Sequence, residues 1–229
     1  MPAARKSILC YVTDRRGLQA PRASSGSSPG GHNSAPPRSL QDSIRRAAAA
    51  GINWIQIREK DLDARSLLEL ARFAVAETHA SVTRVLVNDR LDIALAAGAA
   101  GIHLGEESLP LEAIAEWRRS GGRKDFVIGV SCHSLTSARA AERGGADYVF
   151  FGPVFATPSK AAFGDPQGIE RLREVCAAVE IPVLAIGGVN LGNARACLAA
   201  GAAGVAAIRL FQDAEDVAEV VAVLRGAKQ

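Results

Sequence analysis

The chain has 229 residues, of which 48% are hydrophobic and 22% are charged, and it carries a formal net charge of +3. A chain of this size can bury one substantial core, so we expect a single α/β domain over residues 1–229 rather than two small domains. The charge is spread along the sequence without the basic stripe of a nucleic-acid surface, and no apolar stretch is long enough to span a bilayer. We therefore expect small-molecule partners, no nucleic acid and no membrane.

The predicted elements begin with the strand "ILCYVT" at 8–13. Residues 17–38, "GLQAPRASSGSSPGGHNSAPPR", are rich in Ser, Gly and Pro and have little to bury, so we predict a loop insertion there. Whether this loop is ordered as a lid or disordered is left open. His32 within it is expected to be solvated.

Four similar phrases follow along the chain, each with an alanine- or glycine-rich helix end, a glycine and a short apolar run: 49–57, 96–104, 143–151 and 199–208. This pattern is typical of a helix that ends at a glycine and passes into a buried strand. Further apolar runs of strand length lie at 84–88, 126–130 and 182–186. Together with 8–13 they make eight strands, each followed by a stretch with helical spacing such as "SLLELARFAVAETH".

Eight such units predict a (β/α)₈ TIM barrel, with a doubly wound open sheet as the alternative. In a barrel, side chains that follow the carboxyl ends of the strands converge on one pocket. The polar residues at these positions, in chain order, are Gln56, Arg58, Glu59, Lys60, Asn88, Asp89, Arg90, His103, Glu106, Glu107, Ser108, Ser131, His133, Thr157, Ser159, Lys160, Gly187, Gly188 and Arg209.

The segment "QIREK" places Gln56 and Arg58 on one side of a strand and Lys60 beyond its end. These three donors of different reach could hold a heterocycle and its phosphate, although an exposed charged turn would have the same composition. An arginine in the barrel mouth needs an anion beside it, which favours the binding interpretation.

The loop "GPVFATPSKAAFGDP" supplies the hydroxyls of Thr157 and Ser159 and the cation of Lys160. Such a loop can surround an anion with hydroxyl and backbone donors. The pair Gly187 and Gly188 in "AIGGVN" allows close backbone approach to another side of that anion, in the region where such barrels bind phosphate. We therefore predict a phosphate site from these two loops.

Two histidines, His103 and His133, follow strands near these anion-binding groups. A single histidine near a strand end is as readily a hydrogen-bonded structural residue as a proton carrier, and both interpretations stay open for each.

The motifs "YVTDR", "IQIREKDL", "VNDR", "GIHLGEESLP", "GVSCHS", "GPVFATPSK", "AIGGV" and "GVAAIRLF" occur in this order between Tyr11 and Phe211. In that order they closely resemble the superfamily of thiamine phosphate synthase and the thiazole tautomerase TenI. The resemblance implies a TIM barrel. It also implies a transferase that joins hydroxymethylpyrimidine pyrophosphate to thiazole phosphate, with Mg²⁺ as cofactor and pyrophosphate as leaving group.

The resemblance also implies roles for single residues. Gln56, Arg58 and Lys60 match contacts to the pyrimidine and its pyrophosphate, and Asn88 matches one of these contacts. Ser131 and Lys160 match groups on the pyrophosphate side, and Asp89 matches a magnesium ligand. The thiazole phosphate site is matched by Thr157, Ser159, Gly187 and Gly188. We assign catalytic roles to Arg58, Lys60, Lys160 and His133, because a departing pyrophosphate needs cations and His133 matches a proposed proton carrier.

Two positions depart from the synthase pattern. The pattern "HLGQEDLP" has an aspartate where this chain has Ser108, and a neutral hydroxyl is a poor ligand for a hard dication. The metal site would then consist of Asp89, Ser108 and Glu107, with Glu106 as the alternative to Glu107. The pattern also has a serine where this chain has Arg209, which could add charge to the phosphate site.

Ser108 leaves two functions open. A thiamine phosphate synthase is our first hypothesis, because the motifs "REK", "NDR" and "TPSK" are all present. The alternative is a metal-independent, TenI-like tautomerase that acts on a thiazole carboxylate phosphate with His133 as the acid or base. A binding module that retains only the phosphate site is a third hypothesis.

The four cysteines, Cys10, Cys132, Cys176 and Cys197, have no metal-binding spacing and follow no secretory signal. We expect buried free thiols and a cytoplasmic protein. The oligomeric state stays open, with a homodimer as one expectation.

Overall fold

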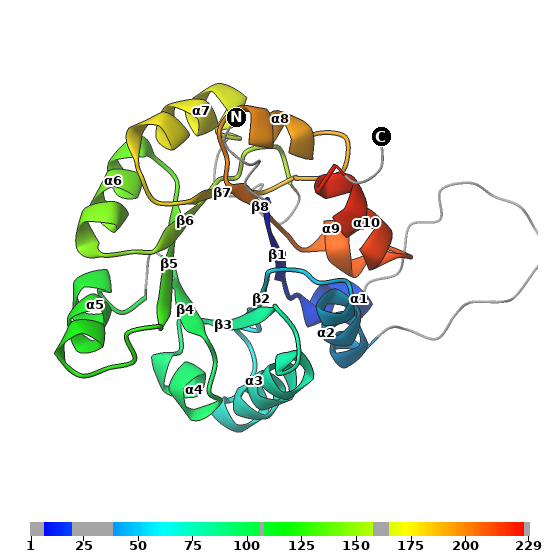
Figure 1. Cartoon of the computed structure of the whole chain (residues 1–229), viewed down its shortest axis with the longest axis vertical. Helices are drawn as coiled ribbons and strands as arrows, with labels where there is room; N and C mark the ends of the chain where they lie inside the picture. The colour runs from blue at the N-terminus through cyan, green and yellow to red at the C-terminus, as the bar shows by residue number, and fades with distance from the viewer. Residues whose placement is uncertain (1–6, 20–38, 106–107, 158–164, 227–229) are drawn as a thin grey trace, which may run out of the picture.

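The structure, a computed structural model, describes residues 7–19, 39–105, 108–157 and 165–226. Eight parallel strands form one closed barrel in sequence order, and helices surround it (Figure 1). The strands are β1 (Ile8–Val12), β2 (Trp54–Ile57), β3 (Arg84–Asn88), β4 (Gly101–Leu104), β5 (Val127–Cys132), β6 (Tyr148–Phe151), β7 (Val183–Ile186) and β8 (Gly204–Ala207). The prediction of a (β/α)₈ barrel is confirmed, and the open sheet is excluded.

Helices follow every strand in the described part of the chain. They are α1 (Arg15–Gln19), α2 (Leu40–Ala49), α3 (Ala64–Thr78), α4 (Leu91–Ala96), α5 (Leu111–Ser120), α6 (Leu135–Gly144), α7 (Gly168–Ala178), α8 (Ala194–Ala199), α9 (Arg209–Gln212) and α10 (Val217–Leu224). The short helix α1 includes residues 17–19, which we predicted as the start of a loop. Residues 20–38 of that predicted insertion lie outside the described residues.

Local sequence explains where the longer helices begin. Asp63 caps α3 by accepting from the backbone N–H groups of Arg65 and Ser66, and Ser134 caps α6 by accepting from the N–H of Ser137. Gly145 takes the left-handed conformation after α6, with φ of 95°, as the glycine pattern predicts.

Two hydrophobic clusters lie on the two sides of the barrel wall. The larger one fills the space between strands and helices, and the smaller one fills the barrel interior with Cys10, Val12, Leu86, Tyr148, Phe150, Leu184 and Ala206. Successive residues of a strand point to opposite sides of the wall. Inward-facing residues near the carboxyl ends of the strands therefore reach the mouth of the barrel, directly above the inner cluster.

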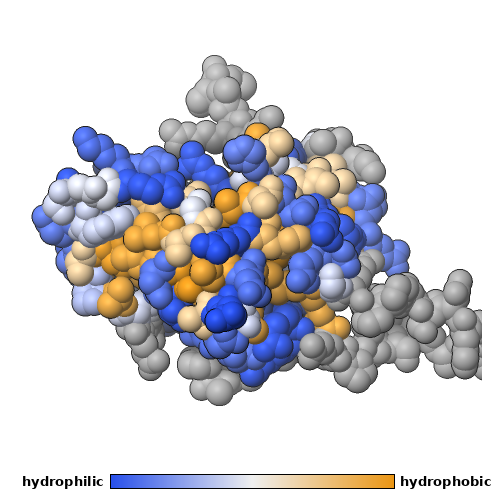
Figure 2. Space-filling view, turned by 90° about the horizontal axis from the view of Figure 1, so that it is seen from below, coloured by the Kyte–Doolittle hydropathy of each residue, from blue (hydrophilic) through white to orange (hydrophobic). Residues whose placement is uncertain are grey.

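The helices form the outer surface of the barrel. Figure 2 shows the side on which α3 and α4 lie, where hydrophobic residues are interspersed with hydrophilic ones. No helix in the described ranges is long and apolar enough to cross a membrane. A homodimer stays a prediction.

Candidate functional site

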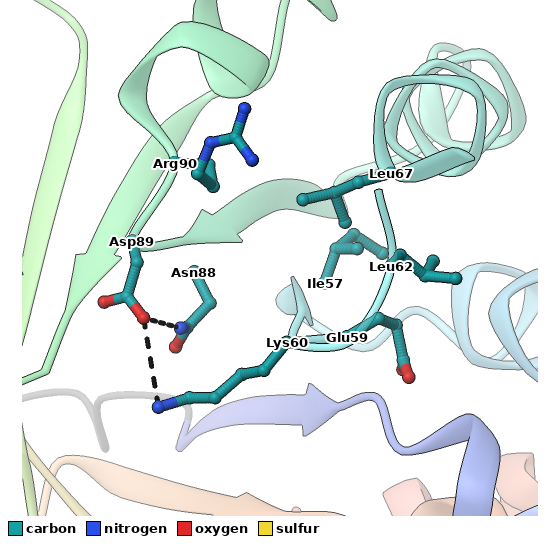
Figure 3. A pocket seen from close by; sticks show the side chains of 8 residues that line it. All are labelled: Ile57, Glu59, Lys60, Leu62, Leu67, Asn88, Asp89 and Arg90. Atoms are coloured by element: carbon teal, nitrogen blue, oxygen red, sulfur yellow. Dashed lines mark hydrogen bonds and ion pairs between the residues drawn. The ribbon is translucent and has the colours of Figure 1, made fainter. Parts of the chain in front are cut away.

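A connected polar cluster lies at the carboxyl ends of β2 and β3. Gln56 is 1% exposed, and its Nε2 donates to Asn88 Oδ1 at 2.8 Å. The amide of Asn88 donates in turn to Asp89 Oδ2. Lys60 lies in the loop after β2, and its Nζ is 4.0 Å from the same carboxylate oxygen (Figure 3). The structure thus brings together four residues that lie at the ends of two neighbouring strands or in the loops that follow them.

The other oxygen of Asp89 faces the loop after β4. Asp89 Oδ1 accepts from the backbone N–H of Gly105 at 3.2 Å and from the hydroxyl of Ser108. That hydroxyl also accepts from the N–H of Gly105 at 2.6 Å. Ser108 therefore supports Asp89 as a hydrogen-bond donor, while Glu106 and Glu107 lie outside the described residues. Direct ligation of a metal by Ser108 stays a prediction.

Asp89 has an unusual backbone conformation. Its φ is 61°, and no other non-glycine residue in the described part of the chain has a positive φ. Its N–H donates to the carbonyl of His103 at 2.9 Å, which ties the end of β3 to β4. Backbone strain of this kind costs about 1–3 kcal/mol and is concentrated at functional sites. In this conformation the Asp89 carboxylate faces Gly105 and Ser108.

A pocket of about 230 Å³ adjoins this cluster (Figure 3). Apolar side chains of β2, the following loop and α3 form one wall, and polar side chains of the two loops form the other. The lining residues are Ile57, Glu59, Lys60, Leu62, Leu67, Asn88, Asp89 and Arg90. In this view Lys60 extends toward Asp89, whereas Glu59 points away from it. A half-apolar, half-polar cavity of this kind suits a small molecule with one charged end.

The loop that carries Arg58 and Lys60 is held by buried contacts. The hydroxyl oxygen of Thr13 accepts from the N–H of Arg58 at 2.9 Å. Glu59, 5% exposed, accepts from the N–H of Arg15 at 3.1 and 3.2 Å. Burial raises the pKa of the Glu59 carboxyl, against the opposing hydrogen bonds from Thr13 and the Arg15 N–H. Glu59 thus anchors the loop to α1, a role that its sequence position alone does not reveal.

His103 of β4 lies inside the barrel below the mouth. It is 2% exposed, with Nδ1 2.9 Å from the hydroxyl of Tyr148 and Nε2 2.9 Å from the hydroxyl of Ser131. The pKa of its imidazole is lowered to about 3, mainly by burial, with the charge of Asp89 opposing this shift and the charge of Arg58 adding to it. His103 is therefore neutral at physiological pH. This favours the interpretation of His103 as a hydrogen-bonded structural residue over its interpretation as a proton carrier.

His133 follows β5 and is half-buried. Its Nδ1 donates to the carbonyl oxygen of Gly152 after β6. Nδ1 therefore carries a proton in this arrangement. A catalytic role for His133 stays a prediction.

The loops after β6 and β7 lie against each other. The N–H of Val154 donates to Ile186 O at 2.9 Å, and the N–H of Phe155 donates to Gly187 O at 3.0 Å. A Cβ at Gly188, where φ is 66°, would lie 2.6 Å from the carbonyl oxygen of Ala156. The glycine pair is thus required for this close approach, which brings Thr157 and the turn after β7 to the same side of the mouth.

The remaining predicted residues are placed only in part. Arg209 is exposed and is the first residue of α9, directly after β8. Ser159 and Lys160 lie outside the described residues. Within residues 7–19, 39–105, 108–157 and 165–226, no group of three or more His, Cys, Asp or Glu side chains is arranged to hold a metal ion.

Comparison with known proteins identifies the family. A family model described as thiamine monophosphate synthase matches residues 31–211. A protein of Geobacter sulfurreducens is 52% identical over 171 residues, 75% of this chain and 78% of that protein. The thiamine-phosphate synthase of Moorella thermoacetica is 46% identical over 182 residues, 80% of this chain and 85% of that protein.

A solved structure agrees with the sequence comparisons over almost the whole chain. Thiamine phosphate pyrophosphorylase from Pyrococcus furiosus superposes with a TM-score of 0.77 at 35% identity, covering 97% of this chain and 95% of that one. The motifs quoted above therefore lie in a fold that this enzyme shares. The chain belongs to the thiamine monophosphate synthase family.

Proposed function

We propose that this chain is a thiamine-phosphate synthase, a transferase that joins hydroxymethylpyrimidine pyrophosphate to thiazole phosphate. The observation that carries the proposal is the linked cluster of Gln56, Asn88, Asp89 and Lys60 at the barrel mouth. Membership of the family supports it, as do the names of the relatives. Its place in metabolism is thiamine biosynthesis.

In this reaction the thiazole nitrogen forms a bond to the pyrimidine methylene carbon, and the bond from that carbon to the pyrophosphate oxygen breaks. The electron pair of the broken bond leaves with the pyrophosphate, so negative charge develops there. We assign to Lys60 and Arg58, which lie on the loop anchored by Glu59, the role of meeting this charge. Cations fixed in position before the reaction lower its barrier without a cost of reorganisation.

We infer that Asp89 contributes to a magnesium site. Mg²⁺ is usually bound by one or two carboxylates together with substrate phosphates and water, and Asp89 supplies a carboxylate oxygen that faces Lys60. Asp89 would hold the ion, with Glu107 as the second carboxylate of our sequence prediction. When bound, Mg²⁺ neutralises charge on the pyrophosphate. Ser108 and Gly105 orient Asp89 through its other oxygen.

The thiazole phosphate is assigned to the loops after β6, β7 and β8. Their close packing through Gly187 and Gly188 supports one shared anion site. Thr157 and Ser159 supply hydroxyl donors to that site, and Arg209 adds a cation. Cytoplasmic location is part of this proposal, because the four cysteines are free thiols.

An assay with both substrates tests the proposal. Wild-type protein should form thiamine phosphate with Mg²⁺ and lose this activity with a chelator. Asp89→Ala should remove most of the activity, whereas Asp92→Ala, which removes an exposed carboxylate paired with Arg90, should retain it. Absence of product from wild type at high enzyme concentration would exclude the synthase.

A second candidate function rests on Ser108. Because this residue donates to Asp89 where the synthase pattern has a carboxylate, the described site offers fewer metal ligands than that pattern. A tautomerase needs no metal, so isomerisation of a thiazole carboxylate phosphate in the presence of a chelator would support it. The variant His133→Ala should then lose this isomerisation. An unaffected variant would reject the tautomerase with His133 as its acid or base.

A further inference from the structure

Three polar side chains meet inside the barrel across β4, β5 and β6. His103 pairs in register with Gly129, and Gly129 pairs with Tyr148. A Cβ at Gly129 would overlap the phenol ring of Tyr148. The glycine therefore leaves the space in which the side chains of His103 and Tyr148 meet across the intervening strand.

The imidazole of His103 is fixed on several sides. Its two nitrogens lie 2.9 Å from the hydroxyl of Tyr148 and 2.9 Å from that of Ser131. Its ring lies 4.2 Å from the ring of Phe150, tilted by 33°. Ser131 stands one residue beyond Val130 on β5, half-buried at the mouth, while Tyr148 is fully buried. The row of hydroxyl, imidazole and hydroxyl thus runs from the barrel interior to the mouth.

The direction of the hydrogen bonds follows from the buried end of this row. Within the described residues, the imidazole is the hydrogen-bond partner of the Tyr148 hydroxyl. If Nδ1 carried the proton, the phenol would accept from it and its own buried proton would have no acceptor, which costs about 1–3 kcal/mol. The phenol therefore donates to Nδ1, and a neutral imidazole must then carry its proton on Nε2.

We propose that His103, protonated on Nε2, is a positioning residue that makes Ser131 a hydrogen-bond donor toward an anionic group of the substrate. Nε2–H donates to the oxygen of Ser131, so the proton of Ser131 is available to the mouth. The expected anion is the pyrophosphate of the pyrimidine substrate, and in this respect the inference rests on the proposed function. His103 acts through Ser131 and does not itself transfer a proton.

The opposite tautomer would reverse the row. Ser131 would donate to Nε2 and could offer only its lone pairs to the mouth, where they would repel an anion. The tautomer of His103 therefore decides between a donor and an acceptor at Ser131, and it is directly measurable.

The first experiment reads the tautomer without any assay of activity. The full-length protein is labelled with ¹⁵N-histidine, and long-range ¹H–¹⁵N correlation spectra are recorded near neutral pH. The chain has four histidines, so the signals of His103 are assigned by their loss in His103→Gln. We expect a protonated Nε2 and an unprotonated Nδ1. A protonated Nδ1 would overturn the proposal.

The second experiment measures binding of inorganic pyrophosphate with Mg²⁺ by calorimetry. Loss of one hydrogen bond to a charged group corresponds to weaker binding by about 10- to 100-fold, and we expect this in Ser131→Ala and in His103→Leu. The double variant should bind no more weakly than the weaker single variant, because both remove the same contact. Additive losses would show that His103 does not act through Ser131.

Two conservative variants separate positioning from folding. His103→Gln offers an amide N–H to Ser131 and a carbonyl oxygen to Tyr148, so it should recover most of the binding lost in His103→Leu. Tyr148→Phe keeps the ring in the core and removes the bias on the tautomer, so the Nε2–H signal should weaken. Unchanged tautomer populations in Tyr148→Phe would contradict the proposed direction. If wild type forms no thiamine phosphate, the proposed function fails, while these two readouts still test the row.

Discussion

Replacing Glu59 with alanine should release the loop that carries Arg58 and Lys60. Glu59 is 5% exposed and accepts from the backbone N–H of Arg15 and from the hydroxyl of Thr13. The oxygen of Thr13 in turn accepts from the N–H of Arg58. The substitution therefore leaves the buried hydroxyl of Thr13 and the half-buried N–H of Arg15 without this acceptor, and it removes the contact between the loop and α1.

The expected magnitude follows from these two donors. A buried donor without an acceptor costs about 1–3 kcal/mol, and release of the buried carboxylate offsets part of the sum, so we expect a loss of about 2–4 kcal/mol. For a protein of this size, about 3 °C in Tm corresponds to 1 kcal/mol, so the Tm should fall by about 6–12 °C. The positions of Arg58 and Lys60 should also become less defined. Because these two cations are assigned to the leaving group, kcat should fall as well.

The assay compares thermal unfolding and steady-state kinetics of Glu59→Ala with those of Glu69→Ala. Glu69 is an exposed residue of α3, so its replacement should change neither Tm nor kcat measurably. A Tm of Glu59→Ala equal to that of the control would refute the anchoring role.

The raised pKa of Glu59 adds a pH dependence. Burial raises this pKa above its ordinary value of 4.5, so the folded chain retains a proton that the unfolded chain has already released. Wild-type stability contributed by this group therefore falls as the pH rises from 4.5 through the raised pKa. Glu59→Gln cannot ionise and lacks this fall. The Tm of the glutamine variant minus that of wild type should become more positive across this window, and a constant difference would contradict the assignment.

Two further substitutions test the loops. Gly188→Ala should destabilise more than Gly98→Ala, because both glycines have positive φ but only the first would place its Cβ against Ala156 O; the left-handed conformation alone costs about 1–2 kcal/mol, and equal Tm values would refute the packing argument. Ser108→Asp should lower the Tm without Mg²⁺, because a second carboxylate repels Asp89, and Mg²⁺ should then raise the Tm more than in wild type. An equal response to Mg²⁺ in both proteins would show that residue 108 does not contribute to a metal site.

The sequence predicted the barrel because each unit repeats the same local signals. Glycines after the helix ends and uninterrupted apolar runs are local properties, and both survive in the structure as left-handed caps and buried strands. The convergence of Gln56 and Asn88 also followed, since the rule for the carboxyl ends of strands needs only the strand positions. Their 2.8 Å contact confirms that part of the convergence.

The hydrogen-bond partners within the site could not be predicted in this way. The meeting of His103 with Tyr148 depends on the register of β4, β5 and β6 and on the missing side chain of Gly129. The burial of Glu59 depends on α1, whose residues 17–19 we assigned to a loop from their composition. Both contacts depend on tertiary structure. Short sequences such as "YVFF" and "REK" therefore do not predict them.

Three polar side chains at the mouth are each oriented by another residue beneath or beside them. Asn88 is held by Gln56, Asp89 by Ser108 and Gly105, and Ser131 by His103. Donors and carboxylates that are fixed before a ligand arrives need little reorganisation when charge develops, which is the main source of electrostatic catalysis. Because the supporting residues lie on neighbouring strands of a closed barrel, loss of one of them should weaken catalysis more than it weakens folding. Measurement of both kcat and Tm in Ser108→Asp and His103→Leu tests this difference.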